Sequence, residues 1–363
     1  ITNLLNLDVT ANLFHIGLRN KLGSFSLFAN ARAKMDLLYD DDFIEFIANG
    51  NGNRIGSAIS FDETRIRLNS FHEIGIGYAR TFMNDRLTVG ARVKMINGLF
   101  HASTADGAKA SISTDANTFN WTVAVQNGTI NTAGLDFFLN DQDYEGNEMT
   151  DYLISNDNSG MALDIGAKFQ IFDWLLVEAS VNDLGSINWK EQARNYNTAD
   201  TTVVFSGVQL RGLEDSNQVL EDSLAGKFRS NETQAAFKTS LSARTYLSAS
   251  YTPSKNDRFT VMAYNNHVFG RVKPEMAVSY NRRAGDFTFG VVSSFRGRGN
   301  NTNIGFNMAA NLGPFQIYLA TDNMFVLKKP ELRSKADFRF GLNLMFGYKK
   351  FKDKEAIVNL DAL

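Results

Sequence analysis

The sequence predicts an all-β protein: a transmembrane antiparallel up-and-down β-barrel of about 14 strands. Three observations predict it: long segments of period-two alternation, a scarcity of proline, and connections that are alternately short and long. Residues 65–95 show the alternation most clearly, with Ile74, Ile76 and Val89 on one parity and small or charged residues such as Arg92 on the other. This period of two is typical of strands, whereas a helix repeats its apolar residues every three to four positions.

The two arms of this segment meet at a tight turn, residues 83–86. Each arm is longer than a typical strand of a soluble protein, which has about 5–6 residues. A strand that crosses a bilayer at a tilt needs about 9–11 residues. The alternate positions with charged and small residues suit a water-filled barrel interior, and those with apolar residues suit contact with lipid. The segment therefore predicts a membrane-crossing β-hairpin.

The composition agrees with a barrel and excludes several other classes. The chain of 363 residues is 44% hydrophobic, and its mean hydropathy is −0.23. No run approaches 18 apolar residues, so a transmembrane helix is excluded. Only 4 prolines occur beside 28 glycines, as expected of a chain that is mostly paired strand, because proline removes a ladder donor. The aromatic content of 12% suits a lipid-facing surface with interfacial girdles.

Taken in order, the alternation predicts thirteen strands and one short helix. The strands are expected at residues 10–20, 24–35, 65–82, 87–95, 161–171, 175–182, 241–251, 259–267, 274–280, 287–296, 304–312, 315–321 and 338–346. The helix is expected near residues 40–50, which begin with aspartate and end with Asn-Gly. Bacterial single-chain barrels have even strand numbers. One further strand is therefore expected upstream of residue 1, giving fourteen, with twelve or sixteen as alternatives.

The connections between these strands are of two kinds. Short turns are expected near residues 21–23, 83–86, 172–173, 253–257, 283–286 and 313–314. Longer connections are expected at residues 36–64, 97–159, 185–239, 268–273, 297–302 and 322–336. Outer-membrane barrels alternate in this way, with short periplasmic turns and longer extracellular loops.

This pattern gives one domain, an outer-membrane barrel over residues 1–348, followed by a periplasmic tail at 349–363. Extracellular inserts are expected at about 36–64, 97–159 and 185–239. The second insert includes a possible hairpin, residues 109–113 with 120–126, and the third a possible helix near 213–224.

Three stretches carry a resemblance to a known family: HEIGIGYARTFMNDRLTVGARVKMINGLF, GMALDIGAKFQIFDWLLVEASVNDLGSINW and ADFRFGLNLMFGYKK. They resemble an uncharacterised family of Bacteroidota outer-membrane β-barrels. That family is similar to the long-chain fatty-acid transporters (FadL-type) and to the shuttle barrel of the type IX secretion system (PorV-type). The most specific pieces are NDLGSINW at 182–189 and Gly-Asn-Gly at 50–52. The resemblance implies a fourteen-stranded barrel in the outer membrane of a Gram-negative bacterium.

The lumen parity of the predicted strands holds ten basic and four acidic residues. These candidate lumen-lining residues are Arg19, Arg32, Lys34, Arg67, Arg92, Lys94, Lys168, Arg244, Arg296 and Arg339, with Glu73, Asp164, Glu178 and Glu275. A basic interior could select anionic solutes. The favoured interpretation is a salt-bridge lattice that stiffens a closed barrel, with a plug supplying further carboxylates. Trp174 opens a strand beside a short turn, so we interpret it as an interfacial anchor.

Nothing in the sequence predicts an enzyme, a metal site or a cofactor. The four histidines are dispersed without metal-ligand spacing, and there is no cysteine. No Gly-x-Ser-x-Gly motif occurs, and the glycine-rich residues 50–56 lack the lysine of a phosphate loop. The net charge of −2 gives no indication of a nucleic-acid partner.

Two functions fit this prediction. The favoured one is a structural or accessory subunit that docks on a larger envelope complex of the secretion or outer-membrane assembly type, because two inserts are large. The alternative is a FadL-like transporter or channel for hydrophobic or small anionic ligands. The expected partners are outer-membrane lipid or lipopolysaccharide and other envelope proteins. A soluble all-β protein is the third and least favoured possibility.

Overall fold

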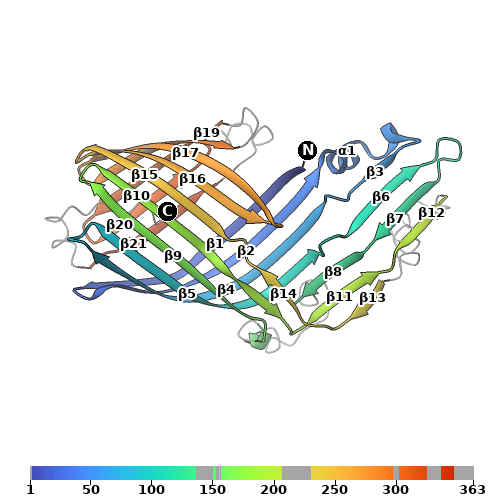
Figure 1. Cartoon of the computed structure of the whole chain (residues 1–363), viewed down its shortest axis with the longest axis horizontal. Helices are drawn as coiled ribbons and strands as arrows, with labels where there is room; N and C mark the ends of the chain where they lie inside the picture. The colour runs from blue at the N-terminus through green and yellow to red at the C-terminus, as the bar shows by residue number, and fades with distance from the viewer. Residues whose placement is uncertain are drawn as a thin grey trace.

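Thirteen strands of the described part of the chain form one antiparallel wall that curves into a barrel (Figure 1). The computed structural model describes residues 2–135, 150–152, 155, 157–206, 230–296, 302–324 and 337–346. Neighbours along the wall are, in order, β1 (Thr2–Asn20), β2 (Gly23–Asp40), β4 (Arg65–Phe82), β5 (Leu87–Thr104), β9 (Ser159–Phe172), β10 (Leu175–Trp189), β15 (Arg244–Ser254), β16 (Asp257–Val268), β17 (Arg271–Ala284), β18 (Phe287–Arg296), β19 (Thr302–Leu312), β20 (Phe315–Thr321) and β21 (Arg339–Leu344). The predicted all-β, up-and-down barrel class is confirmed.

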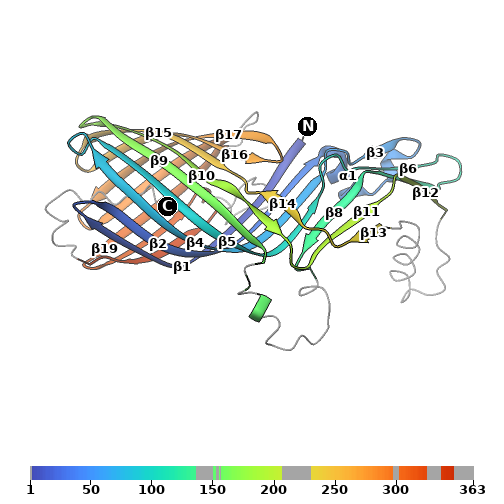
Figure 2. The ribbon, with the colours of Figure 1, turned by 60° about the horizontal axis from the view of Figure 1, so that its bottom comes forward.

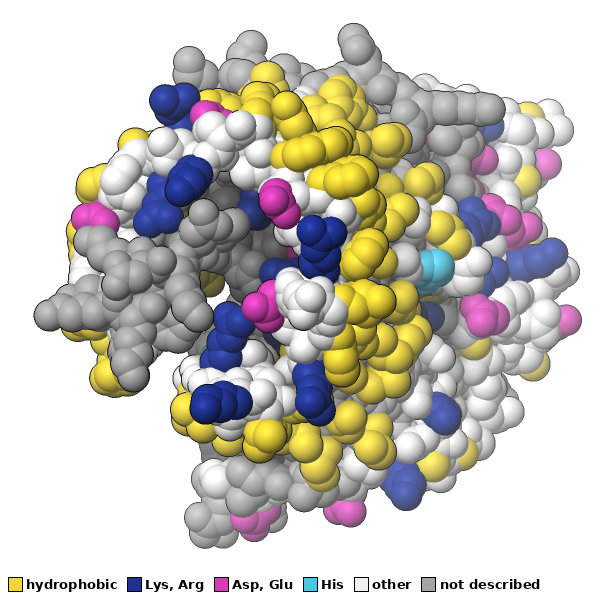
Figure 3. Space-filling model, turned by 60° about the vertical axis from the view of Figure 1, so that its left-hand side comes forward, with side chains coloured by type: hydrophobic (Ala, Val, Ile, Leu, Met, Phe, Trp, Pro, Cys, Tyr) yellow, Lys and Arg dark blue, Asp and Glu magenta, His cyan; other side chains and the backbone are white. Residues whose placement is uncertain are grey.

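The outer face of the wall is apolar. Ile74, Val89, Ile165 and Phe340 are 56%, 40%, 46% and 67% exposed, although a soluble fold would bury such side chains in its core. On the face seen in Figure 3, hydrophobic side chains form a broad band, with polar side chains beyond it. This arrangement is that of a transmembrane β-barrel, in which lipid covers the apolar band. It contradicts the soluble alternative.

Aromatic side chains gather on the outer face near the short turns. Trp174 stacks on Phe172 at 5.0 Å between ring centroids and meets Tyr251 edge-on at 5.8 Å. Phe259 lies 4.8 Å from Tyr280 on the neighbouring strand. Such rings mark the boundary between the hydrocarbon and the head groups. Trp174 is 48% exposed within this girdle, which is where an interfacial anchor would lie.

At the other end the longest strands leave the band and continue into further sheet structure. The wall is extended beyond the apolar band by β8 (Gly128–Ala133), β11 (Ala193–Thr198), β13 (Ser230–Thr233) and β14 (Phe237–Ser240). A separate four-stranded sheet consists of β3 (Ala58–Ser60), β6 (Lys109–Thr114), β7 (Trp121–Gln126) and β12 (Thr201–Phe205). Both views show these strands projecting beyond the barrel, and we call them the extramembrane sheets (Figures 1 and 2).

Two of the predicted loop elements lie at this end. The helix α1 (Asp41–Asn49) follows β2, and the carboxylate of Asp40 caps it by accepting a 3.0 Å hydrogen bond from the backbone N–H of Phe43. The short loop helix is thus confirmed. The predicted hairpin at 109–113 and 120–126 corresponds to β6 and β7. The predicted helix at 213–224 and the tail at 349–363 lie outside the described residues.

Several strands are longer than predicted, and β-bulges are the reason. β1 begins at Thr2 instead of residue 10, because its register against β2 shifts between Asn12 and Phe14. The extra residue of a bulge changes which of the two parities faces outward. The outward residues before this bulge therefore have odd numbers, whereas those after it have even numbers, and the alternation is interrupted. β5 continues past residue 95 to Thr104 through a shift opposite Ser70 and Phe71.

One predicted long connection is wrong. Residues 268–273 were expected to form a longer loop, but β16 and β17 are joined directly through Phe269 and Gly270. Both residues have positive φ angles, +52° and +69°, as the central positions of a tight hairpin turn require. Short and long connections therefore do not alternate strictly along the chain.

The wall ends at two strands that run in the same direction. β1 and β21 each run toward the short-turn end, and no pairing joins them within the described ranges. An antiparallel wall with an odd number of strands always has two such parallel edges. The strand expected upstream of residue 1 would run the opposite way between them, and it stays a prediction.

Candidate functional site

An aspartate in a bulge of β10 lies at the centre of the lumen. The register between β9 and β10 shifts between Val181 and Leu184, and Asp183 adopts the left-handed backbone conformation, with φ +60°. The shift turns Asp183 inward, where it is 2% exposed, while Leu184 resumes the outward face at 44% exposed. Asparagine and aspartate tolerate this backbone conformation better than most residues, which suits the sequence to the bulge.

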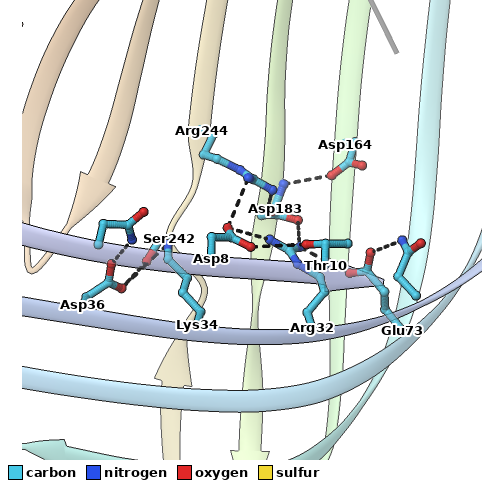
Figure 4. A network of polar contacts seen from close by, with 12 residues as sticks. Asp8, Thr10, Arg32, Lys34, Asp36, Glu73, Asp164, Asp183, Ser242 and Arg244 are labelled. Atoms are coloured by element: carbon cyan, nitrogen blue, oxygen red, sulfur yellow. Dashed lines mark hydrogen bonds and ion pairs between the residues drawn. The ribbon is translucent and has the colours of Figure 1, made fainter. Parts of the chain in front are cut away.

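Three basic side chains from three different strands converge on Asp183, and Figure 4 shows two of them, Arg32 and Arg244. Its Oδ1 accepts hydrogen bonds from Arg32 Nη1 at 3.0 Å and from Lys94 Nζ at 2.5 Å. Its Oδ2 accepts one from Arg244 Nη2 at 2.6 Å. Charge-assisted bonds of this kind are the strong ones in a protein interior. One carboxylate thus joins β2, β5 and β15.

Three more carboxylates surround these bases. Glu73 Oε2 lies 3.5 Å from Arg32 Nη1, and Asp164 Oδ1 lies 2.7 Å from Lys94 Nζ. Asp8 Oδ2 lies 3.4 Å from Arg244 Nη1 and 3.6 Å from Arg32 Nη2. We call this set the ionic layer. It consists of Asp8, Arg32, Glu73, Lys94, Asp164, Asp183 and Arg244.

The ionic layer bridges parts of the wall that are far apart along the sheet. Five wall strands, β2, β4, β5, β9 and β10, separate β1 from β15, yet Asp8 and Arg244 make an ion pair between them. A second bridge joins Ser242 Oγ to Asp36 Oδ2 at 3.3 Å. Side chains from strands far apart along the wall therefore meet across this part of the lumen.

Toward the extramembrane sheets the interior is packed with buried apolar side chains. Phe71, Ile96, Ile187 and Trp189 form a buried cluster with two alanines, and Trp189 is fully buried. Its indole Nε1 donates a 2.8 Å hydrogen bond to Thr239 Oγ1. Gly98 makes the room: a Cβ there would lie 2.5 Å from Cζ3 of Trp189. The ionic layer is thus followed by an aromatic and aliphatic core.

His101 lies against this core, beyond the end of the outward apolar run of β5 at Met95. It is fully buried, its ring lies 5.0 Å from that of Trp189, and its two nitrogens lie 2.6 Å from Asn69 Oδ1 and 2.9 Å from Ser103 Oγ. Burial, with a smaller contribution from Arg67, lowers the pKa of His101 to about 3. The imidazole is therefore neutral in the folded state.

This neutrality predicts a pH dependence. The unfolded histidine takes up a proton below its ordinary pKa of about 6.5, and the folded one does not until about pH 3. The unfolded state therefore binds more protons between these values, so stability is constant above about pH 6.5 and falls by about 1.4 kcal/mol per pH unit as the pH drops below it. Hydrogen exchange of β5 and β8 amides between pH 7 and 5 measures this change.

The histidine variants separate this effect from general acid sensitivity. His101→Asn is expected to remove most of the change in local opening free energy, whereas His267→Gln, at an exposed histidine, is expected to leave it intact. Equal pH profiles for the wild type and His101→Asn would contradict a neutral buried imidazole.

The turn between β16 and β17 contacts strands across the interior. The guanidinium of Arg67, on β4, lies 4.7 Å from the centre of the Phe269 ring. Arg271, which opens β17, forms an ion pair with Glu63, in the segment before β4. The ion pair is largely exposed and contributes at most about 1 kcal/mol, and a partly buried cation–π contact contributes about 0.5–2 kcal/mol. We call this pair of contacts the clasp, and it holds the hairpin tip against the opposite wall.

The comparisons with known proteins show a family. A model described as a family of unknown function (DUF5723) matches residues 1–322. The chain belongs to the DUF5723 family. A search of curated proteins finds no match.

Solved barrels are similar to this DUF5723 chain at low identity. The toluene transporter TbuX of Ralstonia pickettii is 9% identical with a TM-score of 0.40, over 94% of this chain and 89% of that one. A deletion mutant of the monoaromatic hydrocarbon channel TodX is 9% identical with a TM-score of 0.40, over 88% and 83%. The monoaromatic hydrocarbon channel CymD is 9% identical with a TM-score of 0.39, over 88% and 82%.

The structure brings five of the predicted lumen residues together and distributes the rest. Arg32, Glu73, Lys94, Asp164 and Arg244 are in the ionic layer of the DUF5723 protein. Two of the other predicted residues make ion pairs elsewhere: Lys34 Nζ lies 3.7 Å from Asp36 Oδ2, and Arg339 Nη2 lies 3.2 Å from Asp337 Oδ2. Arg67 is in the clasp, and the guanidinium of Arg92 lies over the ring of Phe28. The inner face is lined in other places by Arg19, Lys168, Glu178 and Glu275. Arg296 is opposite Glu275 in register, and its side chain is outside the described set.

Three acidic members of the lumen were missed from the sequence. Asp183 and Asp8 lie beyond bulges, which reverse the parity that the prediction used. Asp36 follows the residue at which the second strand was expected to end. The wall thus supplies three carboxylates that offset part of the predicted excess of basic residues. No group of three or more histidine and carboxylate side chains is placed to hold a metal ion in the described ranges.

Proposed function

We propose that this protein is a non-enzymatic outer-membrane barrel that works as a structural or accessory subunit of an envelope complex. In this proposal the barrel anchors the chain in lipid, and the extramembrane sheets dock other envelope proteins. The observation that supports it best is the ion pair between Asp8 and Arg244. It joins the first and last of seven wall strands at a partly buried ionic layer, as suits an anchor more than an open pore.

The extramembrane sheets carry features that suit docking. Phe119, in the turn between β6 and β7, is 62% exposed, and Val204 on β12 is 55% exposed. Both side chains lie beyond the lipid-facing band, so lipid does not cover them. Large exposed apolar side chains are common in surfaces that bind another protein.

A second candidate function, a FadL-like transporter, is favoured by a different part of the lumen. The inner face of β17 to β21 carries uncharged amides, with Gln316 Nε2 donating to Asn311 Oδ1 at 2.8 Å and Asn343 Nδ2 to Gln316 Oε1 at 2.9 Å. These amides lie outside the ionic layer. A polar face of this kind suits a small anionic ligand better than a hydrophobic one.

Photo-cross-linking in native membranes distinguishes the two functions. A benzophenone side chain at Phe119 is expected to give one discrete protein adduct in high yield, because the position faces a docked subunit. The same group at Ile74 is the matched control and is expected to give lipid adducts, because that side chain faces the bilayer. Lipid or no adduct at Phe119, together with a small molecule retained in the purified lone barrel, would favour transport and contradict the docking role.

A further inference from the structure

Several cations on the inner face near the short turns form no ion pair within the described ranges. Four of them are Arg19 on β1, Arg92 on β5, Lys168 on β9 and Arg258 on β16. All four share the inward parity of their strands, and none forms an ion pair with another residue in the described part of the chain. The ionic layer, by contrast, satisfies each of its bases with at least one carboxylate.

Arg92 shows why this charge is left over. Its cross-strand neighbour on β9 is Asp164, the natural partner for an arginine in a sheet. Oδ1 of Asp164 instead lies 2.7 Å from Lys94 Nζ and accepts a 2.8 Å hydrogen bond from the backbone N–H of Asp183. The guanidinium of Arg92 lies 5.6 Å over the ring of Phe28 and stays exposed. The carboxylate of Asp164 is therefore paired within the ionic layer, and the guanidinium of Arg92 forms no ion pair with it.

The wall beside Arg92 is lined with very small side chains. In register with it, on three successive strands, are Gly77, Ser26 and Gly17. A Cβ at Gly77 would lie 2.4 Å from Ser26 Oγ and 3.0 Å from Cγ of Arg92, so the arginine stem lies directly against this strand. Seen from the short-turn side, the molecule is hollowed, and Lys and Arg side chains lie around the hollow with a smaller number of Asp and Glu side chains (Figure 3). We call this region the basic recess.

We propose that the basic recess binds an acidic peptide segment that enters from the short-turn end of the barrel. Its cations project from four separate strands, and neighbouring strands are about 4.8 Å apart. One phosphate-sized ion cannot contact all of them, whereas successive carboxylates of an extended chain can. The ionic layer closes the inner end of the recess. The proposal concerns the end opposite the extramembrane sheets, so it does not depend on what docks there.

Calorimetric titration of the full chain tests this proposal. The protein is reconstituted in nanodiscs of phosphatidylcholine, which has no net charge, and is titrated with hexaglutamate, with hexalysine and with inorganic phosphate. Hexaglutamate is expected to bind and to weaken as salt is raised, because the contacts are between exposed charges. Hexalysine is expected not to bind, and phosphate is expected to bind far more weakly.

Two variants place the binding in the recess. The double variant Arg19→Gln with Arg92→Gln is expected to weaken hexaglutamate binding about tenfold or more, since each 1.4 kcal/mol is a factor of ten. Neither residue is in the ionic layer, so the variant is expected to fold. Arg80→Gln is the matched control: Arg80 lies near the same turns but on the outer face, over Phe82. Absent binding, unchanged binding in the double variant, or phosphate binding as tight as that of the peptide would each overturn the proposal.

Discussion

Replacing Asp183 with asparagine is expected to destabilise the barrel by about 3–5 kcal/mol. The substitution removes the one carboxylate that contacts Arg32, Lys94 and Arg244 together. Removing one partner of a buried ion pair leaves an uncompensated buried charge, which costs about this much. Asparagine keeps the side-chain volume and tolerates the positive φ of the bulge, so the loss reports on charge and not on backbone strain.

Urea unfolding in lipid vesicles, followed by circular dichroism, measures this loss. Asp85→Asn is the matched control, because Asp85 also has a positive φ, +68°, and lies exposed in the short turn between β4 and β5. The control is expected to change stability by less than about 0.5 kcal/mol, as surface substitutions usually do. If Asp183→Asn were as stable as Asp85→Asn, the ionic layer would not hold the wall together.

Replacing Trp189 with alanine is expected to cost about 3–5 kcal/mol. The side chain is fully buried among Phe71, Ile187 and the ring of His101, and it fills the space over Gly98. Removing so large a buried ring loses its transfer free energy and leaves a cavity. The loss is expected to be greatest near the extramembrane sheets, because the cluster joins β4, β5, β9 and β10 at that end.

Trp174→Ala provides the comparison for this second substitution. Trp174 is about half exposed in the aromatic girdle, so its removal creates no internal cavity. Its expected effect on urea unfolding is well below that of Trp189→Ala. Hydrogen exchange is expected to rise in β8 and β11 only for Trp189→Ala, and equal profiles for the two variants would contradict a dry core above the ionic layer.

The outer face of this protein could be predicted from sequence because it depends only on local alternation. The parity of Ile74, Val89 and Ile165 is fixed within each strand, and lipid requires an apolar side chain at each such position. The same holds for the turns, where Asn-Asp and Pro-Ser-Lys-Asn-Asp punctuate the pattern. These parts of the fold needed no knowledge of distant contacts.

The ionic layer could be predicted only in part, because it depends on bulges and on contacts across the lumen. Asp8 and Asp183 lie on the wrong parity until the extra residue of a bulge is known. The ion pair between Asp8 and Arg244 joins residues 236 apart in sequence, and its formation depends on how strongly the wall curves. The excess of basic residues was visible in the sequence, but the carboxylates that offset part of it were not.

The role of the ionic layer follows from the desolvation free energy of its charged side chains. Buried ion pairs are weak evidence for stability, since desolvation offsets much of their attraction. An apolar contact could close the lumen at similar stability. A network with one central carboxylate, however, requires β2, β5, β10 and β15 to meet in a single arrangement. We therefore interpret the layer as the element that fixes the shape of the wall.

Ion conductance across a planar lipid bilayer tests the central claim most directly, namely that the wall closes its own lumen through the ionic layer. The native protein, inserted from detergent, is expected to give no stable conductance steps, and Asp183→Asn is expected to give intermittent openings. Steady, ohmic steps from the native protein, unchanged by Asp183→Asn, would contradict the account, because they would show an open pore that the ionic layer does not control.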